Sequence, residues 1–236
     1  MACGYVLTAM AEHWLLLNSG PGDAAFNMAF DEALLEFAVT LGEPILRFYG
    51  WTERAASLGY FQKHSEVEQV TLLRPLVRRP TGGGVVPHDT DWTYSLVFPP
   101  GHWWHALRAP ESYRQTHEWI RAAFSKLHVP TDLSAVRRGE LPGQCFAGAE
   151  QFDLLWHGRK IAGAAQRRNR RGLLIQGSIQ PPPLNLARAD WQKAMCDAAV
   201  ERWKVDWTPL EPGPALNERA SELRRKYSSS EYNERR

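Results

Sequence analysis

Cysteine is scarce in this chain of 236 residues, which has only Cys3, Cys145 and Cys196. So few and so scattered thiols exclude a disulfide framework and a cysteine-based zinc site. Long hydrophobic runs are also absent, and a membrane helix needs about 18 consecutive apolar residues. The first twenty residues have no basic start, and their apolar run is interrupted by charge, so they do not match a signal peptide. We therefore expect a cytoplasmic protein that does not span a membrane.

An excess of charge of one sign is lacking as well. The chain has 28 Lys and Arg against 26 Asp and Glu, a formal net charge of +2. This balance does not by itself support nucleic-acid binding, so any electrostatic partner must meet a local patch. Hydrophobic residues make up 44% and charged residues 23%, which is typical of a globular protein. No internal repeat or low-complexity linker divides the chain, and we expect a single domain over residues 1–236.

Hydrophobic spacing predicts a mixture of helices and strands. Phe26, Phe30, Leu34 and Phe37 recur at intervals of three and four residues, which predicts a helix over 23–40 capped near Asp23 and ended at Gly42. Alternation predicts a strand over 92–98. Further strands are expected at 45–49 and 56–60, around a turn at Gly50 and Trp51, and at 151–156, 160–166 and 173–179; further helices are expected from about 110, at 187–203 and at 215–227. Because no regular βαβ alternation appears, the expected class is α+β.

The most unusual stretch is a run of three glycines, Gly82, Gly83 and Gly84, within Arg78–Asp89. Glycines permit positive φ and let a ligand approach the backbone closely. The run matches neither a Walker loop nor a dinucleotide fingerprint. It is either a ligand-binding loop or a flexible hairpin turn. His88, which follows it, could orient a substrate, act as a base, or be structural.

A second candidate is Lys160, in the segment from Gly158 to Arg168. In a strand, Lys160, Ala162, Ala164 and Gln166 would share one face. The small alanines leave room around the ammonium, which could donate a hydrogen bond to a carbonyl or phosphate group. The alternative is a solvated lysine on an edge strand.

Six basic residues lie within thirteen positions of the same region: Arg159, Lys160, Arg167, Arg168, Arg170 and Arg171. They could face an acidic protein surface or a phosphate, or they could be a solvated loop. The eight histidines form no metal-binding pattern, and His102 and His105 are interpreted as structural.

Cys145 is the third candidate. A free cysteine is usually a small buried hydrophobic residue, but a thiolate near a lysine has a lowered pKa and can accept an acyl group. Cys3 and Cys196 are interpreted as structural or incidental.

Several motifs in a fixed order carry a family resemblance. The motifs are Asn27–Glu32, Arg47–Trp51, Ser57–Gln62, the glycine run with Arg79, Thr81 and His88, then Thr93–Ser95, Lys160–Arg167 and Gly177–Ile179. Together they resemble the lipoate–protein ligase A/biotin ligase family over roughly residues 13–233. Cys145 and Phe146, shortly before Phe152–Leu154, resemble the nucleophile motif of the octanoyltransferase branch.

The resemblance implies a catalytic domain like those of class II aminoacyl-tRNA and biotin synthetases, with a mixed, largely antiparallel sheet flanked by helices. It implies that octanoate moves from acyl carrier protein to the thiol of Cys145. From there it passes to a lysine of a lipoyl domain of 2-oxoacid dehydrogenases or of the glycine-cleavage H protein. Lys160 would hold the carbonyl and help keep Cys145 ionised. Neither a metal nor a cofactor is expected.

The resemblance also assigns substrate binding to a set of residues: Arg79, Thr81, Gly82, Gly83, Gly84, His88, Gly163 and Gln166. The glycines would line an eight-carbon chain, whose burial contributes about 5 kcal/mol at roughly 0.8 kcal/mol per methylene. The basic run at 167–171 would face acidic carrier proteins.

Two positions depart from the family pattern: Gln176, where the family often has His, and Ala164, where Asn or Ser is common. Three alternatives therefore stay open beside octanoyl transfer from acyl carrier protein. They are ATP-dependent lipoate ligation, octanoyl transfer between two lipoyl-bearing proteins, and a non-catalytic protein that binds an acyl group or carrier protein. ATP is a cosubstrate only in the ligase alternative.

Overall fold

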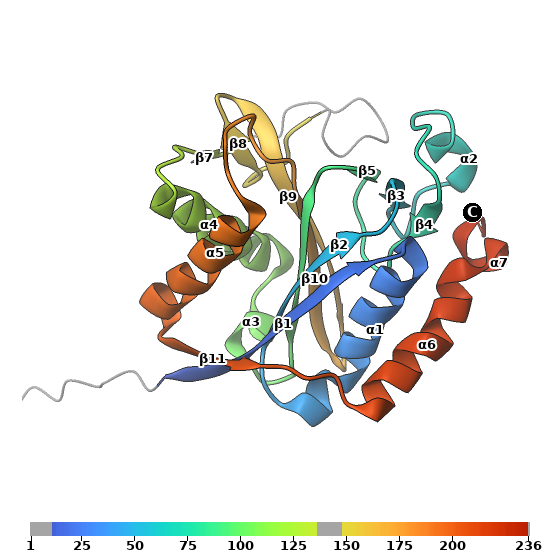
Figure 1. Cartoon of the computed structure of the whole chain (residues 1–236), viewed down its shortest axis with the longest axis horizontal. Helices are drawn as coiled ribbons and strands as arrows, with labels where there is room; N and C mark the ends of the chain where they lie inside the picture. Colours follow the sequence, from blue (N-terminus) through green and yellow to red (C-terminus); the bar gives the residue numbers. More distant parts are fainter. Residues whose placement is uncertain (1–10, 136–147, 236) are drawn as a thin grey trace, which may run out of the picture.

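The strands of the computed structural model, which describes residues 11–135 and 148–235, form one large and one small sheet (Figure 1). The large sheet has the strand order β11-β1-β2-β6-β10-β9-β8-β7. Its strands are β1 (Glu12–Gly22), β2 (Ile45–Trp51), β6 (Trp92–Phe98), β7 (Asp132–Leu133), β8 (Leu154–Trp156), β9 (Arg159–Asn169), β10 (Gly172–Ile179) and β11 (Val205–Pro209). The small sheet has the order β4-β3-β5, with β3 (Ala55–Leu58), β4 (Leu76–Arg78) and β5 (Val86–His88).

The pairing in the large sheet is mixed but largely antiparallel. β2, β6, β10, β9, β8 and β7 pair antiparallel in succession, whereas β1 pairs parallel with both β2 and β11. The helices are α1 (Ala24–Leu41), α2 (His64–Val67), α3 (Trp103–Ala106), α4 (Ala109–Lys126), α5 (Arg188–Trp203), α6 (Pro214–Ser228) and α7 (Ser230–Asn233). The α+β class expected from the sequence is confirmed.

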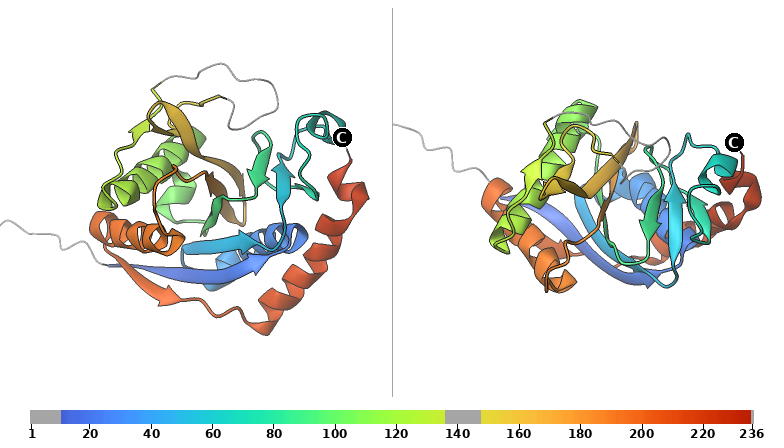
Figure 2. Two further views of the ribbon diagram at one scale, coloured as in Figure 1. Left: turned by 45° about the horizontal axis from the view of Figure 1, so that its top comes forward. Right: turned by 90° about the horizontal axis from the view of Figure 1, so that it is seen from above.

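Helices cover both faces of the large sheet (Figure 2). The strand predicted at 92–98 is confirmed, and its large side chains Trp92, Tyr94, Leu96 and Phe98 join a core with residues of α4 and α5. On the opposite face, α1 packs on the sheet and α6 packs against α1 in a second core. The functional residues described below lie on this second face, between α1, the large sheet and the small sheet.

Capping fixes the limits of α1, as the sequence predicted. The Asp23 carboxylate accepts a hydrogen bond of 2.8 Å from the Phe26 amide, and Gly42 ends the helix with φ of 75°. Asp31, in the middle of α1, is fully buried and forms an ion pair of 2.7 Å with Arg47 of β2. Ser95 donates to the same carboxylate at 2.6 Å. This pairing fixes α1 over the centre of the sheet.

Two features of the chain differ from the expected elements. The turn predicted at Gly50 and Trp51 is wrong, because both residues continue β2 and the chain turns after them before entering β3. Strands β1 and β11 were not expected, since their sequences do not alternate regularly between apolar and polar residues. The tight corner expected at His157 and Gly158 is confirmed, with positive φ at both residues.

Candidate active site

A pocket lies on the α1 face of the large sheet, where the sheet meets β3 and β5. It is lined by residues of α1, both sheets and the segment after β4: Met28, Tyr49, Ser57, Arg79, Val86, His88, Thr93, Gly163, Ala164, Ala165, Gln176, Gly177 and Ser178. Four of these residues form a row across neighbouring strands, because Gly163 pairs with Ser178, Ser178 with Thr93, and Thr93 with Tyr49. Directly paired residues in antiparallel strands point to the same face. The row therefore runs along the pocket from β9 to β2.

A buried ammonium stands at the β9 end of this row. The Nζ atom of Lys160 lies 2.7 Å from a carboxylate oxygen of Asp153, and both side chains are almost completely buried. A Cβ atom on Gly163 would lie 2.9 Å from Lys160 Cε and 3.1 Å from Nζ. The lysine thus occupies the place where a side chain at position 163 would be. Glycine at this position is what brings the ammonium into the row.

Asp153 holds this lysine as part of a larger cluster. Its carboxylate also accepts hydrogen bonds from the hydroxyl of Tyr113 on α4 and, at 2.6 Å, from the Glu150 amide. The ring of His117 lies 4.3 Å from that of Tyr113. Burial lowers the pKa of His117 to about 4, and the Lys160 charge acts in the same direction while Asp153 opposes it. His117 is therefore neutral near pH 7.

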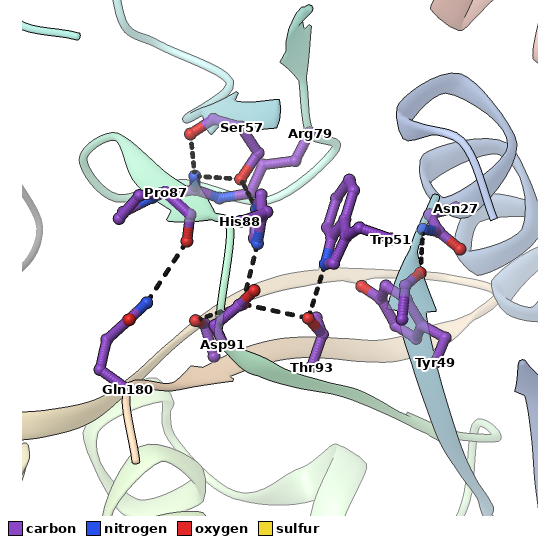
Figure 3. Close-up of polar contacts among 12 residues, drawn as sticks. Asn27, Tyr49, Trp51, Ser57, Arg79, Pro87, His88, Asp91, Thr93 and Gln180 are labelled. Atoms are coloured by element: carbon purple, nitrogen blue, oxygen red, sulfur yellow. Dashed lines mark hydrogen bonds and ion pairs between the residues drawn. The ribbon is translucent and has the colours of Figure 1, made fainter. Parts of the chain in front are cut away.

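At the other side of the pocket, His88 is fixed by three contacts (Figure 3). Its Nε2 atom lies 2.8 Å from Ser57 Oγ, and its Nδ1 atom lies 2.9 Å from a carboxylate oxygen of Asp91. The indole of Trp51 stacks on the imidazole with a centroid distance of 3.8 Å. Pairing of β3 with β5 brings Ser57 to His88, although 31 residues separate them in sequence.

The Asp91 carboxylate ties this histidine to the row of pocket residues. The same oxygen accepts from Thr93 at 3.1 Å and from Ser178 at 2.7 Å. Thr93 in turn accepts a hydrogen bond of 2.8 Å from the indole NH of Trp51 (Figure 3).

The glycine loop folds around Arg79. The guanidinium donates to the carbonyl oxygens of Gly82 at 3.0 Å, Gly84 at 2.7 Å and Ser57 at 3.0 Å. Gly83 has φ of 84°, a left-handed conformation that glycine adopts without strain. The loop is thus organised by its own arginine, whose side chain, and not the glycine backbone, lines the pocket.

Gln176 completes the lining through a chain of hydrogen bonds. Its amide oxygen accepts from Thr81 at 2.8 Å, and its amide nitrogen donates to Asp31 at 2.7 Å. All six polar side chains of the lining, at positions 57, 79, 88, 93, 176 and 178, therefore have hydrogen-bond partners within the protein. A polar wall whose groups are already paired gains little from a polar ligand, so the pocket suits an apolar one.

Comparison with known proteins agrees with this arrangement. The family described as lipoyl protein ligase A/B catalytic domain matches residues 23–180. The chain belongs to this family. Octanoyltransferase LipM of Staphylococcus aureus is 36% identical over 184 residues, which cover 72% of this chain and 66% of LipM. The match thus spans slightly less than two thirds of that relative's length.

Solved structures show that the fold is shared. Protein Ta0514 from T. acidophilum superimposes with a TM-score of 0.78 at 22% identity, covering 96% of this chain and all of that one. A bi-partite lipoate protein ligase from Thermoplasma acidophilum, solved with its E2 lipoyl domain, gives a TM-score of 0.69 at 22% identity, covering 95% and 96%. The mixed, largely antiparallel sheet implied by the family resemblance is therefore confirmed.

Most residues that the lipoyl ligase family resemblance selected are brought together. Arg79, His88 and Gly163 line the pocket, Thr81 bonds to its lining residue Gln176, and Lys160 adjoins Gly163. Cys145 lies outside the described residues, so its role stays a prediction. Cys196 is half-buried in α5, and burial raises the pKa of its thiol to about 12, which agrees with a structural role.

Two expectations about binding residues need correction. Gln166 is not part of the pocket lining, because it lies on the opposite face of β9 from Gly163 and bonds to α4: it donates to the Ala109 carbonyl and accepts from Ser112. The glycine run was expected to form the wall of the acyl slot, but its carbonyls face Arg79 and the lining does not include it.

The basic run is also less available than expected. Arg167 pairs with Glu32 at 3.3 Å and Arg171 pairs with Glu36 at 2.7 Å, while Arg168 donates to backbone carbonyls of α3. Acidic residues of α1 thus neutralise much of the predicted patch, and the sequence could not show this because α1 lies more than 130 residues earlier.

Several functional candidates were missed by the sequence analysis. Asp153, Tyr113, Ser57, Asp91 and Ser178 belong to the two hydrogen-bonded clusters, but each is brought there by pairing between distant elements. Asp91 alone had a local signal, since an acid three residues after a histidine can bond to it within a turn. Residues 11–135 and 148–235 contain no group of three His, Cys, Asp or Glu side chains that could hold a metal ion. In the same part of the chain, no helix has the length and apolar character needed to cross a membrane.

Proposed function

We propose that this protein is an octanoyltransferase that takes an octanoyl group from the thioester of acyl carrier protein and delivers it to a lysine. The acceptor lysine belongs to a lipoyl domain or to the glycine-cleavage H protein. The observation that carries the proposal is a pocket of paired polar and apolar side chains with a buried, carboxylate-held ammonium at one end. Such a pocket matches an apolar chain ending in a polar carbonyl. The 36% identity to octanoyltransferase LipM supports the choice of acyl group.

The proposed chemistry has two acyl transfers. The thiolate of Cys145 attacks the thioester carbonyl, a new sulfur–carbon bond forms, and the carrier thiol leaves with a proton. The acceptor amine then attacks the acyl-enzyme, loses a proton as the amide forms, and the Cys145 thiolate leaves. Exchange between thioesters is nearly isoenergetic, so neither ATP nor a metal takes part.

Lys160 and Asp153 act at the carbonyl in this proposal. The ammonium donates a hydrogen bond to the carbonyl oxygen as negative charge develops on it, which lowers the barrier of both transfers. Asp153 holds the ammonium at 2.7 Å, and Gly163 leaves the space in which it reaches the pocket row.

The position of Cys145 in the chain fits the role of nucleophile. The segment that contains it leaves the sheet after Ser134 and returns before Phe152, and these two residues hydrogen-bond to each other at 2.8 Å. Ser134 also donates its amide to the Asp153 carbonyl at 2.9 Å. Both ends of the segment are therefore fixed beside the carboxylate that holds Lys160.

The acceptor class is inferred from the family and from one structural relative. The lipoate protein ligase of Thermoplasma acidophilum that shares this fold was solved with its E2 lipoyl domain. We extend this to a lipoyl-domain or H-protein acceptor here, and we place the reaction in the cytoplasm.

The proposal is tested by mixing the protein with octanoyl-acyl carrier protein and an unlipoylated lipoyl domain, with ATP omitted. Octanoylation of the acceptor lysine, measured by mass spectrometry, is expected for the wild type and lost in Cys145→Ala. Cys196→Ala is the matched control and should transfer normally, because its buried thiol is not available. Octanoylation that requires ATP and free octanoate, and survives in Cys145→Ala, would select the ligase mechanism instead.

A further inference from the structure

The pocket row has a definite length between the ammonium and the next fixed side chains. From Gly163 on β9 the row passes Ser178 on β10 and reaches Thr93 on β6, with Tyr49 on β2 beyond it. Neighbouring strands are spaced by about 4.8 Å, so the distance from β9 to β6 is roughly 10 Å. A staggered chain of seven carbon–carbon bonds, each about 1.5 Å long, also extends roughly 9 Å. An octanoyl group with its carbonyl at Lys160 would therefore end over Thr93.

Thr93 is held more firmly than an ordinary threonine on a strand. Its hydroxyl accepts from the Trp51 indole at 2.8 Å and donates to Asp91 at 3.1 Å, and only 3% of the residue is exposed. Trp51 in turn stacks on His88, and His88 is bonded to both Ser57 and Asp91 (Figure 3). A side chain fixed by such a network cannot rotate away to admit a longer chain without breaking several hydrogen bonds.

The same network makes this end of the pocket suitable for a methyl group. Both functions of the Thr93 hydroxyl are satisfied within the protein, and so are both nitrogens of His88. A terminal methyl placed against them leaves no donor or acceptor newly unpaired. By contrast, a charged or hydroxylated chain end would find no free partner there.

We propose that Thr93, fixed by Trp51 and Asp91, is the end stop that sets the accepted acyl chain at about eight carbons, and that Ser178 lies beneath the middle of that chain. This inference rests on the proposed function, because it places the carbonyl at Lys160. It assigns chain-length selection to the strand row and not to the glycine loop.

The test uses the graded position of the two side chains. Thr93→Leu adds bulk at the far end, so octanoyl acceptance should fall at least tenfold relative to hexanoyl. Ser178→Leu adds bulk one strand nearer to Lys160, so hexanoyl should be rejected as well and the optimum should move to still shorter chains. Thr93→Val keeps the shape but not the hydroxyl and should retain the octanoyl optimum. Thr208→Leu, an exposed threonine on β11, is the matched control.

Two readouts separate this inference from the proposed function. Acyl-enzyme formation is measured with acyl carrier proteins that carry four to twelve carbons, and binding of the free fatty acids is measured by calorimetry. A shift of both length profiles in the order Ser178→Leu, Thr93→Leu, wild type supports the inference. The same order in binding alone, with no acyl-enzyme in the wild type, removes the transferase proposal but keeps the end stop. Equal loss at all lengths in both leucine variants, or no binding of any chain by the wild type, overturns it.

Discussion

Glycine at position 163 has a structural reason that involves a single neighbouring side chain. Its backbone is ordinary for a strand, but a Cβ atom there would lie 2.9 Å from Lys160 Cε. Contacts shorter than 3.0 Å force one partner to move, and the flexible lysine moves more easily than the strand. Gly163 therefore determines where the ammonium lies without touching the protein's stability strongly.

Gly163→Ala is expected to lower the rate of acyl-enzyme formation by about 10- to 100-fold, because a displacement of about 1 Å misplaces the carbonyl donor. The rate is measured by rapid quench and intact mass. Gly213→Ala is the control, since no atom lies near the added methyl group. Unchanged kinetics in Gly163→Ala would show that the ammonium does not act from its present position.

Sequence motifs selected single residues of the site but not their partners. Lys160 and His88 were recognised because they follow distinctive local patterns. Their fixing groups were not, since Asp153 reaches Lys160 through an irregular β8–β9 pairing and Ser57 reaches His88 through the small sheet. Only the folded chain shows that each candidate is held by a carboxylate.

At the scale of elements, local signals predicted what local physics determines. Helix α1 has apolar residues at helical spacing and a cap at each end, and strand β6 alternates regularly, so both were predicted almost to the residue. Strands β1 and β11 depend on parallel pairing between the two ends of the chain. Residues with no periodic pattern become strands there because a neighbouring strand supplies their hydrogen bonds, which no short window of sequence contains.

The attachment of α1 to the sheet depends on one buried carboxylate. Asp31 pairs with Arg47 at 2.7 Å and accepts from Ser95, Tyr49 and Gln176. Asp31→Ala leaves the Arg47 charge buried without its counterion, so the unfolding free energy should fall by about 3–5 kcal/mol. Urea denaturation measures this change.

Glu218→Ala, an exposed acidic residue of α6, is the control and should change stability by less than about 0.5 kcal/mol. A similarly small effect of Asp31→Ala would mean that α1 is held by its apolar face alone.

At the scale of the whole molecule, the buried His117 links stability to pH. Its pKa of about 4 lies below the value of about 6.5 in an unfolded chain, so the unfolded state binds more protons between these two values. Stability from this group is complete above pH 6.5 and is lost as the pH falls toward 4. The total is on the order of 3 kcal/mol at about 1.4 kcal/mol per pKa unit.

His117→Gln should flatten the dependence of unfolding free energy on pH between 6.5 and 4, measured by urea denaturation at several pH values. The matched control is His64→Gln, which changes a histidine near the surface on α2. A slope that persists in His117→Gln would assign the pH dependence to other groups.

The arrangement of the whole molecule places one pocket, one buried ammonium and one cysteine-bearing segment at the same side of the sheet. The central claim is that an acyl group from a thioester becomes attached to that cysteine without ATP. The most direct measurement is the intact mass of the protein after mixing with octanoyl-acyl carrier protein alone, followed by peptide mapping. The account predicts a single octanoyl adduct on Cys145 that a lipoyl domain removes; an unmodified protein, or an adduct that persists in Cys145→Ala, would contradict it.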